Sequence, residues 1–492
     1  MPAVDADRAS GAWTTRIRES SRGQVRAVDI VGVIVQDAGR VKDPGRDRRC
    51  VALCGLRLAL ALSTVALSTV ALSTVALSTV ARANPPAPPP RVGPPPPPSP
   101  FAPPGDAAAM AERPFGRATY RPGGGLTVRS QDGRFALGVS MWAQLQFAAK
   151  HDPMPAAGAP PTSATLELRR ARLVLQGHAF SPHLKFYAHL MFSPKDLGFK
   201  DGVPTRAPIF QWYTTVTRLK NAQVQAGFYF VPYARQRMQP LPRLQFIDNS
   251  TASYEFTLDQ DMGMQVSSPD IAGLGLMRYY AGVVMGEGYD WYRPSDLGLT
   301  YMGRFEVLPL GMFEDFAEAD FERPRTPKLS IGTAYAYSDR DRRTRAIAGT
   351  GFADGGTMRS HNLTADLMFK WAGLSLLADV YLRRASRQAG DLHDTDGMPI
   401  AVQAARNGQG WTAQMGLFVP RTRAEVTARS AGVRPPRSLP TSLGRLDEVG
   451  GGLNYYFYRH AFKLQLDYIH TWGPALPTGR GEQLRLQLQL VF

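Results

Sequence analysis

Basic residues recur at every second position in several segments of the chain. Within residues 168–179, Arg170, Arg172 and His178 share one parity and alternate with apolar residues. Side chains at alternate positions of an extended strand lie on the same face, so these groups would line one face of a strand. Strand parity selects the following candidate pore-lining residues: Arg170, Arg172, His178, Lys185, His189, Arg278, Arg304, Lys370, Arg383, Arg423, Arg429, Lys463 and Arg485.

The chemistry of such a face is anion attraction. A guanidinium group can donate two parallel hydrogen bonds to one oxyanion, and cations lining a water-filled passage lower the barrier for anions and raise it for cations. The chain carries 57 Lys and Arg against 41 Asp and Glu, a formal net charge of +16. Arginine-rich loops such as residues 340–345 could supply this excess without any selection for anions. The charge therefore favours an anion passage without requiring one.

Other reactive groups are few. His178 and His189 could approach each other on neighbouring strands, but no Cys or carboxylate set completes a metal site. The acidic segment 314–322 could hold a divalent cation, although an exposed acidic loop is the simpler interpretation. No Gly-x-Ser-x-Gly sequence occurs, and Gly-rich residues 123–125 lack the context of a phosphate-binding loop. We expect no catalytic, cofactor-binding or metal-binding residues, no cofactor and no enzymatic activity; the basic segments also lack the context of a nucleic-acid-binding fold.

The elements that must position these residues are alternating strands. In residues 481–492, Leu occupies every second position from 484 to 490, and Arg485, Gln487 and Gln489 lie between. In a membrane barrel the apolar face of such a strand meets lipid and the polar face a wet lumen. Residues 363–371 and 374–383 repeat the pattern, and the intervening Ala-Gly pair predicts a tight hairpin turn.

A soluble β-sandwich explains any one of these segments but not the set. Their apolar faces are continuous, their polar faces carry charge, and no all-apolar core strands accompany them. Each segment has about 10 residues, the length of a tilted membrane strand. We therefore expect an all-β fold, a transmembrane antiparallel barrel in which the last strand pairs with a first strand near residues 135–147. Short turns and long loops should alternate, and Phe492 is expected to act as an assembly signal.

The N-terminal region predicts export. A basic stretch precedes the apolar residues 58–80, which contain Ala-Leu-Ser-Thr-Val four times in tandem, and the small-x-small triplet 81–83 follows. This arrangement is typical of a signal peptide cleaved after Ala83; an uncleaved membrane anchor is the alternative. Both cysteines, Cys50 and Cys54, precede that site, so the mature chain would have no thiol.

Four regions are expected along the chain. Residues 1–45 are a misannotated or non-structural extension from a misassigned start, 46–83 the signal peptide, 84–124 a disordered proline-rich linker and 125–492 the barrel. Proline fixes φ and lacks an amide donor, so the linker should be an extended tether. Binding of a partner by this segment is the alternative.

Several motifs resemble, in order, the phosphate-selective porin O and P family. They lie at residues 168–173, 227–233, 261–266, 280–283, 451–457 and 486–492. The resemblance implies an outer-membrane barrel of about 16 antiparallel strands, a homotrimer, a constriction loop folded into the barrel, and a C-terminal aromatic read by the barrel-assembly machinery. The family often has Gly-Gln-Phe-Lys-x-Pro where this chain has residues 227–232, so Phe230 stands where a lysine is usual. That difference weakens the inference that this chain shares the phosphate selectivity of the family.

We therefore expect a porin for passive diffusion of small hydrophilic solutes, preferring anions such as phosphate or other oxyanions. The alternative is a structural or adhesive barrel tethered to a periplasmic partner through the proline-rich segment; an outer-membrane enzyme is a third class, for which no Ser-His-Asn spacing is evident. The expected location is the outer membrane of a Gram-negative-type cell. Expected partners are that membrane and its lipopolysaccharide, small anions, the barrel-assembly machinery and further copies of the chain, with no nucleic acid.

Overall fold

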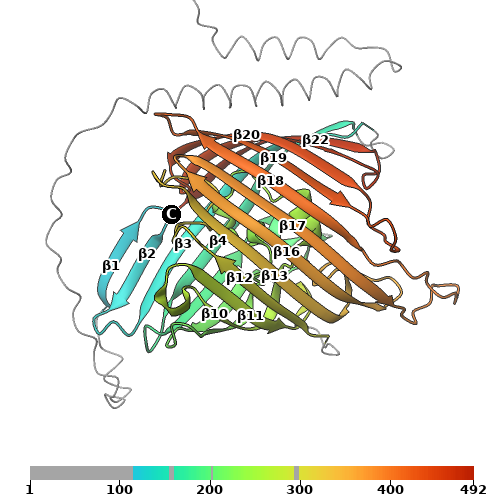
Figure 1. The fold of residues 1–492 in the computed structure, drawn as a ribbon, viewed down its shortest axis with the longest axis horizontal. Coiled ribbons are helices and arrows are strands. Elements are labelled where there is room, and N and C mark those ends of the chain that lie inside the picture. The colour runs from blue at the N-terminus through green and yellow to red at the C-terminus, as the bar shows by residue number, and fades with distance from the viewer. Residues whose placement is uncertain (1–114, 154–159, 201–202, 293–297) are drawn as a thin grey trace, which may run out of the picture. The chain divides into compact units, whose positions relative to one another are not determined.

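The computed structural model describes residues 115–153, 160–200, 203–292 and 298–492. The predicted extension, signal peptide and proline-rich residues 84–105 lie outside these residues. The main sheet has 18 strands, of which 16 form a closed antiparallel ring (Figure 1). The ring runs in chain order through β3 (Ala136–His151), β4 (Thr162–His178), β5 (Leu184–Met191), β8 (Ile209–Val216), β9 (Gln223–Phe230), β10 (Gln260–Ser268), β11 (Met277–Val284), β12 (Thr300–Val307), β13 (Lys328–Asp341), β16 (Thr357–Trp371), β17 (Leu374–Gln388), β18 (Gly408–Phe418), β19 (Ala424–Arg434), β20 (Leu446–Tyr458), β21 (Phe462–Trp472) and β22 (Arg480–Val491).

The last strand closes the ring onto the first. β22 pairs with β3 from Glu482↔His151 to Val491↔Trp142. Beyond it, the amides of Met141 and Phe492 each donate to the other's carbonyl, at 2.7 and 2.8 Å. The predicted transmembrane-type antiparallel barrel, and the predicted pairing of its two end strands, are confirmed.

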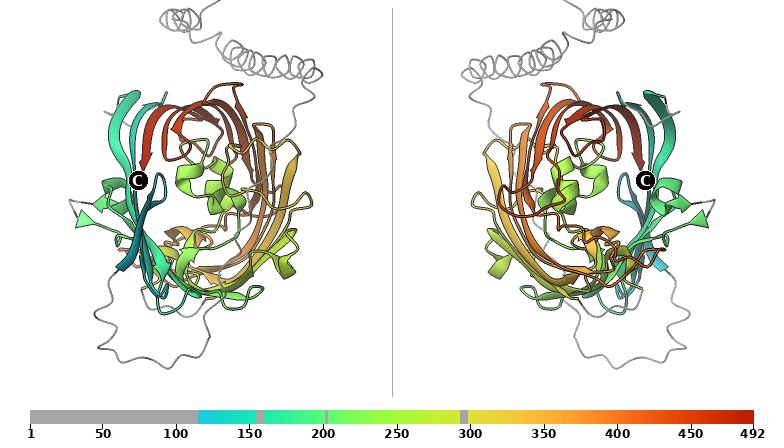
Figure 2. Two further views of the ribbon diagram at one scale, coloured as in Figure 1. Left: turned by 90° about the vertical axis from the view of Figure 1, so that its left-hand side faces the viewer. Right: turned by 90° about the vertical axis from the view of Figure 1, so that its right-hand side faces the viewer.

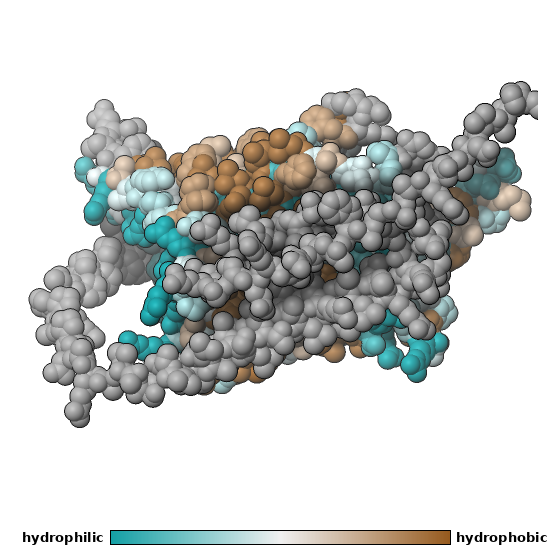
Figure 3. Space-filling view, turned by 90° about the horizontal axis from the view of Figure 1, so that it is seen from above, coloured by the Kyte–Doolittle hydropathy of each residue, from teal (hydrophilic) through white to brown (hydrophobic). Residues whose placement is uncertain are grey.

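The two faces of β22 are as expected from its alternation. Leu484, Leu486, Leu488 and Leu490 are each 40–45% exposed on the outer wall, whereas Arg485, Gln487 and Gln489 are buried inside the ring. Figure 3 shows hydrophobic residues gathered over the wall of the barrel, with hydrophilic ones towards its ends. This is the distribution that a lipid-facing wall requires, since charged residues facing lipid are costly.

The hairpin between β16 and β17 also follows the prediction. Trp371 pairs with Leu374 across the two-residue turn, and Ala372 and Gly373 have φ values of 53° and 94°. Positive φ at both central residues is the type I′ geometry that matches the twist of paired strands. Pro324 and Asp320 accept hydrogen bonds from the two turn amides at 3.1 and 2.8 Å.

A short hairpin extends the sheet on the N-terminal side. β1 (Phe115–Arg121) pairs with β2 (Gly125–Ser130), and β2 pairs with β3 at positions 136–139, beyond the point where β22 ends. Because 115–124 belong to this hairpin, the ordered sheet begins earlier than the expected boundary at residue 125. The sequence of β1 lacks the apolar alternation by which the other strands were predicted.

The connections alternate as expected, with short turns at one end of the barrel and long loops at the other. Two connections fold into the ring instead. Residues 231–259 enter from the long-loop end and carry α5 (Arg235–Met238), η1 (Leu241–Arg243) and α6 (Thr251–Phe256), whose coils lie inside the ring in Figure 2. Residues 308–327, between β12 and β13, enter from the short-turn end. The remaining short elements are α4 (Pro194–Leu197), β6 (Phe199–Lys200), β7 (Val203–Pro204), η2 (Ile271–Gly273), η3 (Gly288–Asp290), β14 (Arg343–Arg345) and β15 (Ala348–Gly351).

The main apolar core lies inside the barrel, where the first inserted segment packs on the wall. Tyr233, Phe256 and Leu258 of that segment pack with Tyr381 and Ala431 of the wall in one buried cluster. In the parts of the chain that the structure describes, no helix is both long and apolar enough to cross a membrane.

Candidate functional site: a basic chamber inside the barrel

A cavity of about 290 Å³ lies inside the ring towards the long-loop end, between the inserted segment 231–259 and the wall formed by β3, β4 and β22. We call it the basic chamber. Its lining residues are Gln146, Ala148, Lys150, Ser163, Thr165, Glu167, Arg169, Lys195, Asp248, Gln483 and Arg485.

A β-bulge gives the chamber two successive arginines. Gln144 pairs with Arg170 but the next residue, Leu145, pairs with Leu168, so Arg169 is the extra residue on β4. A bulge re-aims a side chain that regular alternation would send to the opposite face. Arg169 and Arg170 therefore both reach Asp248, at 3.5 and 2.6 Å. Strand parity missed Arg169, and the Arg-Arg pair itself was the only sequence signal for it.

Asp248 is the carboxylate at the centre of the chamber's cations. It accepts hydrogen bonds from Arg170 at 2.6 Å and from Arg485 at 2.7 Å. Burial alone would raise the pKa of Asp248, but Arg170, Arg485 and Arg169 outweigh burial and hold the pKa well below its ordinary value. The carboxylate is therefore charged at neutral pH.

Cations outnumber carboxylates around the chamber. Among the described residues, the cations Lys150, Arg169, Lys195 and Arg485 line the chamber with the carboxylates Glu167 and Asp248. Arg170, bound to Asp248, and Asp467, bound to Arg485, lie next to this lining and bring the totals to five cations and three carboxylates. Asp467 lies 2.7 Å from Arg485, and Glu167 lies 3.9 Å from the exposed Lys195. The Arg169 side chain is 19% exposed. An anion entering the chamber would thus meet uncompensated positive charge, in part from a guanidinium that can bind two oxygens at once.

Most of the other candidate residues lie inside the ring but are buried against acidic partners. The ion pairs are Arg172 with Asp196 at 2.7 Å, Arg278 with Glu306 at 2.9 Å, Arg304 with Asp366 at 2.6 Å, Arg383 with Glu255 at 3.3 Å and Arg429 with Glu448 at 2.6 Å. Lys370 donates to the carbonyls of Glu314 and Ala319, and Lys463 to that of Leu244. These cations hold the wall and the inserted segments together and are not presented to a solute.

The two inserted segments meet in a buried ionic cluster. Arg235 of the first segment is fully buried. Its guanidinium lies 2.6 Å from Asp366 of β16 and 2.9 Å from Asp315 of the second segment. Asp315 also accepts a hydrogen bond from Arg278 of β11. Burial alone would raise the pKa of Asp315, but Arg235 and Arg278 outweigh burial and lower the pKa. Since a buried charge is tolerated only when paired, Asp315 couples the two segments to the wall.

The interpretation of residues 314–322 as an exposed acidic loop is wrong for three of its carboxylates. Asp315, Glu318 and Asp320 are at most 1% exposed. The backbone amide of Gln245 donates to Glu318 at 2.6 Å, and the amide of Gly373 donates to Asp320. The segment folds inward because Arg235, Arg278 and these amides supply partners for its charges. No group of side chains among the described ranges could hold a metal ion.

The remaining candidates do not converge on one site. His178 lies near the short-turn end, with Nε2 2.9 Å from the carbonyl of Gly133, whereas His189 is buried against the Trp142 and Phe210 rings. Strand register pairs His178 with Lys185 and His189 with Val174, so the two histidines, which could have approached each other on neighbouring strands, lie apart. Lys185 and Arg423 are exposed at the short-turn end, and Arg423 donates to the carbonyl of Phe457 at 2.9 Å.

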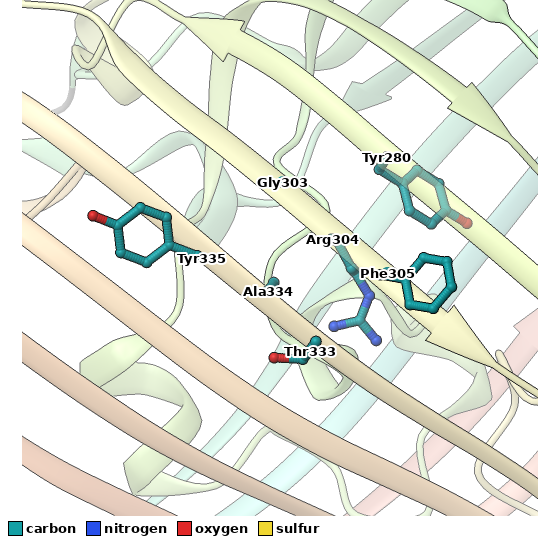
Figure 4. A pocket seen from close by; sticks show the side chains of 7 residues that line it. All are labelled: Tyr280, Gly303, Arg304, Phe305, Thr333, Ala334 and Tyr335. Atoms are coloured by element: carbon teal, nitrogen blue, oxygen red, sulfur yellow. The ribbon is translucent and has the colours of Figure 1, made fainter.

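A second cavity, of about 320 Å³, lies at β12 and β13. Gly303, Phe305, Thr333 and Tyr335 have the outward parity of these strands, and the missing side chain of Gly303 leaves the space between them. Figure 4 shows Arg304 and Tyr335 pointing in different directions; the Arg304 guanidinium binds Asp366 inside the ring. This cavity offers a solute no free charge.

Comparison with solved structures finds outer-membrane proteins at low similarity. A loop-deletion mutant of OmpT from Vibrio cholerae has a TM-score of 0.47 at 10% identity, covering 72% of this chain and 99% of that one. The anion-selective porin from Comamonas acidovorans has a TM-score of 0.45 at 11% identity, and the match covers 72% of this chain and 100% of the porin. Salmonella typhi OmpF in complex with daunomycin has a TM-score of 0.47 at 10% identity, and the match covers 76% of this chain and 100% of OmpF. No protein-family model and no curated protein matches the chain. The 16-stranded closed barrel therefore rests on the strand pairing of the chain itself, and the resemblance to the phosphate-selective porin O and P family stays a prediction.

Proposed function

We propose that this 16-stranded barrel is an outer-membrane channel for passive diffusion of small hydrophilic solutes, and that the basic chamber gives it a preference for anions. The observation that carries the proposal is the excess of cations over carboxylates in a cavity inside the ring, with Arg169 and Arg170 brought together by a bulge. Fixed charge lining a narrow aqueous passage concentrates ions of the opposite sign.

Outer-membrane placement is supported by the wall. Its outward face is apolar along β22 and its neighbours, and its inward face is polar and charged, which is the distribution of barrels that span a membrane. The predicted signal peptide agrees with export to that membrane. The homotrimer is proposed from the family resemblance alone.

Phosphate as the preferred anion has less support. Phe230, at the position where the resembling family often has lysine, packs on Phe210 with ring centroids 5.4 Å apart, and the Arg237 guanidinium lies 4.6 Å from its ring centre. That guanidinium is itself bound to Asp259 at 2.6 Å. We therefore propose small anions in general, including oxyanions, as the solutes that the chamber favours.

The test is the reversal potential of the purified protein in a planar bilayer under a KCl gradient. The wild type should be anion-selective, and Arg169→Gln should lower the ratio of chloride to potassium permeability by up to about tenfold. Removing one unit charge about 6 Å from the passage changes the local concentration of each ion by about threefold, and the two ions change in opposite directions. Arg423→Gln is the matched control, because Arg423 is exposed at the other end of the barrel. A cation-selective wild type, or equal effects of the two substitutions, would contradict the proposal.

A structural barrel is the second candidate, and the two inserted segments favour it. Asp315 and Glu318 of one segment contact Arg235 and Gln245 of the other, so the segments join inside the ring. If they close the passage completely, the reconstituted wild type will show no conductance steps, and the attachment function becomes the better proposal. Deleting residues 84–105 should then abolish binding to a periplasmic partner, whereas a channel would conduct unchanged.

A further inference from the structure

A cluster of basic side chains lies on the outside of the barrel at the long-loop ends of β16 and β17. Arg359, His361 and Arg384 are exposed there, and we call them the outer basic patch. His361 is directly opposite Arg384 in the strand register, and Arg359 lies two residues from His361 on the same face. The patch therefore forms one surface across two neighbouring strands.

Tyrosines of the adjoining strands indicate the depth of the patch in the membrane. Tyr337 pairs with His361 on one side and with Tyr301 on the other, so Tyr301, Tyr337, His361 and Arg384 form one row across four strands. The Tyr337 and His361 rings lie 5.1 Å apart, and the Tyr335 hydroxyl lies 2.7 Å from His361 Nδ1. Aromatic belts mark the interface of a membrane barrel, and an arginine facing lipid is tolerated near the interface but not at the midplane. The row thus lies at the level of the lipid headgroups.

The charge of the patch is only partly compensated. Asp339 lies 3.0 Å from Arg359 and pairs with that guanidinium. Arg384 has no ion pair or hydrogen bond with any side chain in the described part of the chain. Because the Arg384 guanidinium has no such partner at the depth of the lipid headgroups, an anionic group of a lipid can bind it.

We propose that the outer basic patch binds the phosphate groups of a phosphorylated glycolipid, lipopolysaccharide, in the leaflet on the long-loop side. This inference rests on the outer-membrane placement in the proposed function, where long loops face the exterior. Guanidinium groups bind phosphate oxygens in pairs, and the tyrosines beside them can pack their ring faces on a sugar headgroup. Two arginines on adjacent strands fit a headgroup that carries more than one phosphate.

The test is a titration of the purified full chain in detergent with bis-phosphorylated lipid A, followed by the shift in unfolding temperature. The Arg359→Gln/Arg384→Gln double variant should need at least about tenfold more lipid A for half of the maximal shift, since each arginine near a charged surface contributes roughly fivefold. Arg480→Gln is the matched control: Arg480 is an exposed arginine at the long-loop end of β22, five strands along the ring from β17, and Glu482 lies two residues away. Its midpoint should stay within about twofold of the wild type.

Three results would overturn the proposal. They are an unchanged midpoint in the double variant, an equal response to dephosphorylated lipid A, and an equal response to phosphatidylglycerol, which would assign the patch to phospholipid. Conductance of the double variant in a planar bilayer separates this inference from the channel itself. Normal conductance with lost lipid A binding supports both, whereas absent conductance in the wild type with intact lipid A binding contradicts only the channel function.

Discussion

Replacing Asp248 by Asn should make the channel more anion-selective. Asp248 is the carboxylate on which Arg170 and Arg485 converge, at 2.6 and 2.7 Å, with Arg169 at 3.5 Å. Asparagine keeps an oxygen acceptor at that place, so the substitution removes charge with little change in shape. The chamber would gain one net positive charge.

The size of the effect follows from Coulomb's law. Two unit charges about 6 Å apart in water interact by about 0.7 kcal/mol, which changes the local concentration of each ion by about threefold. Because chloride rises while potassium falls, the permeability ratio should increase by up to about tenfold at 0.1 M KCl. At 1 M KCl, where the screening length falls to about 3 Å, most of the difference should disappear.

The assay is the reversal potential across a planar bilayer at both salt concentrations. Asp339→Asn is the control, since this carboxylate is on the outside of the barrel and is likewise bound to arginine. A permeability ratio that does not change in Asp248→Asn, or that changes equally in Asp339→Asn, would refute the assignment of the passage to the chamber.

The dependence on pH provides a second check on Asp248. Its folded-state pKa is depressed, so the charge is present above the ordinary carboxylate range and is lost only as the pH falls through the lower, folded-state pKa. The difference between wild type and Asp248→Asn should therefore persist from pH 7 down to about pH 4. A difference that vanished near pH 4 would show that the three arginines do not hold the carboxylate in its charged form.

Two further substitutions test the packing of the barrel. Asp315→Asn removes one of the two carboxylates, Asp315 and Glu306, that the buried Arg235 and Arg278 share. It should destabilise the barrel by about 3 kcal/mol, the lower end of the cost of breaking a buried ion pair, because Glu306 still pairs with both guanidiniums. The loss should be seen as a lower unfolding temperature and as more frequent conductance transitions. Glu322→Gln, which breaks an ion pair whose two side chains are 59% and 61% exposed, should change neither. Leu486→Arg places a charge on the lipid-facing side of β22 and should lower the free energy of unfolding by about 2–4 kcal/mol if the residue is at the membrane midplane, measured by urea unfolding in lipid vesicles. Leu486→Met is its control, and equal stabilities of the two variants would contradict a lipid-facing β22.

The strand alternation made much of the fold predictable. The period of two in residues 484–490 separated an outward apolar face from an inward polar one, and the Ala-Gly pair located the hairpin between β16 and β17. Parity also placed Arg304, Arg383 and Lys463 inside the ring. These features depend only on residues close in sequence and on whether each side chain is more stable in lipid or in water. They can therefore be predicted from one sequence.

Partners that lie far apart in sequence were not predictable. Arg235 and Asp366 are 131 residues apart in the sequence, and no local sequence pattern predicts their contact. The burial of Asp315 and Glu318 depends on residues 308–327 folding inward to meet residues 231–259. The bulge at Arg169 is a shift in register between two strands, which alternation alone cannot show.

The sequence by itself thus determined which side of the wall each strand residue faces, because alternation requires only the local geometry of a strand between lipid and water. The tertiary structure decided which of the inward cations are neutralised and which remain to attract a solute. The reason is electrostatic: Arg172 and Arg304 are neutralised by carboxylates from distant segments, whereas the five cations around the basic chamber outnumber the carboxylates that reach them.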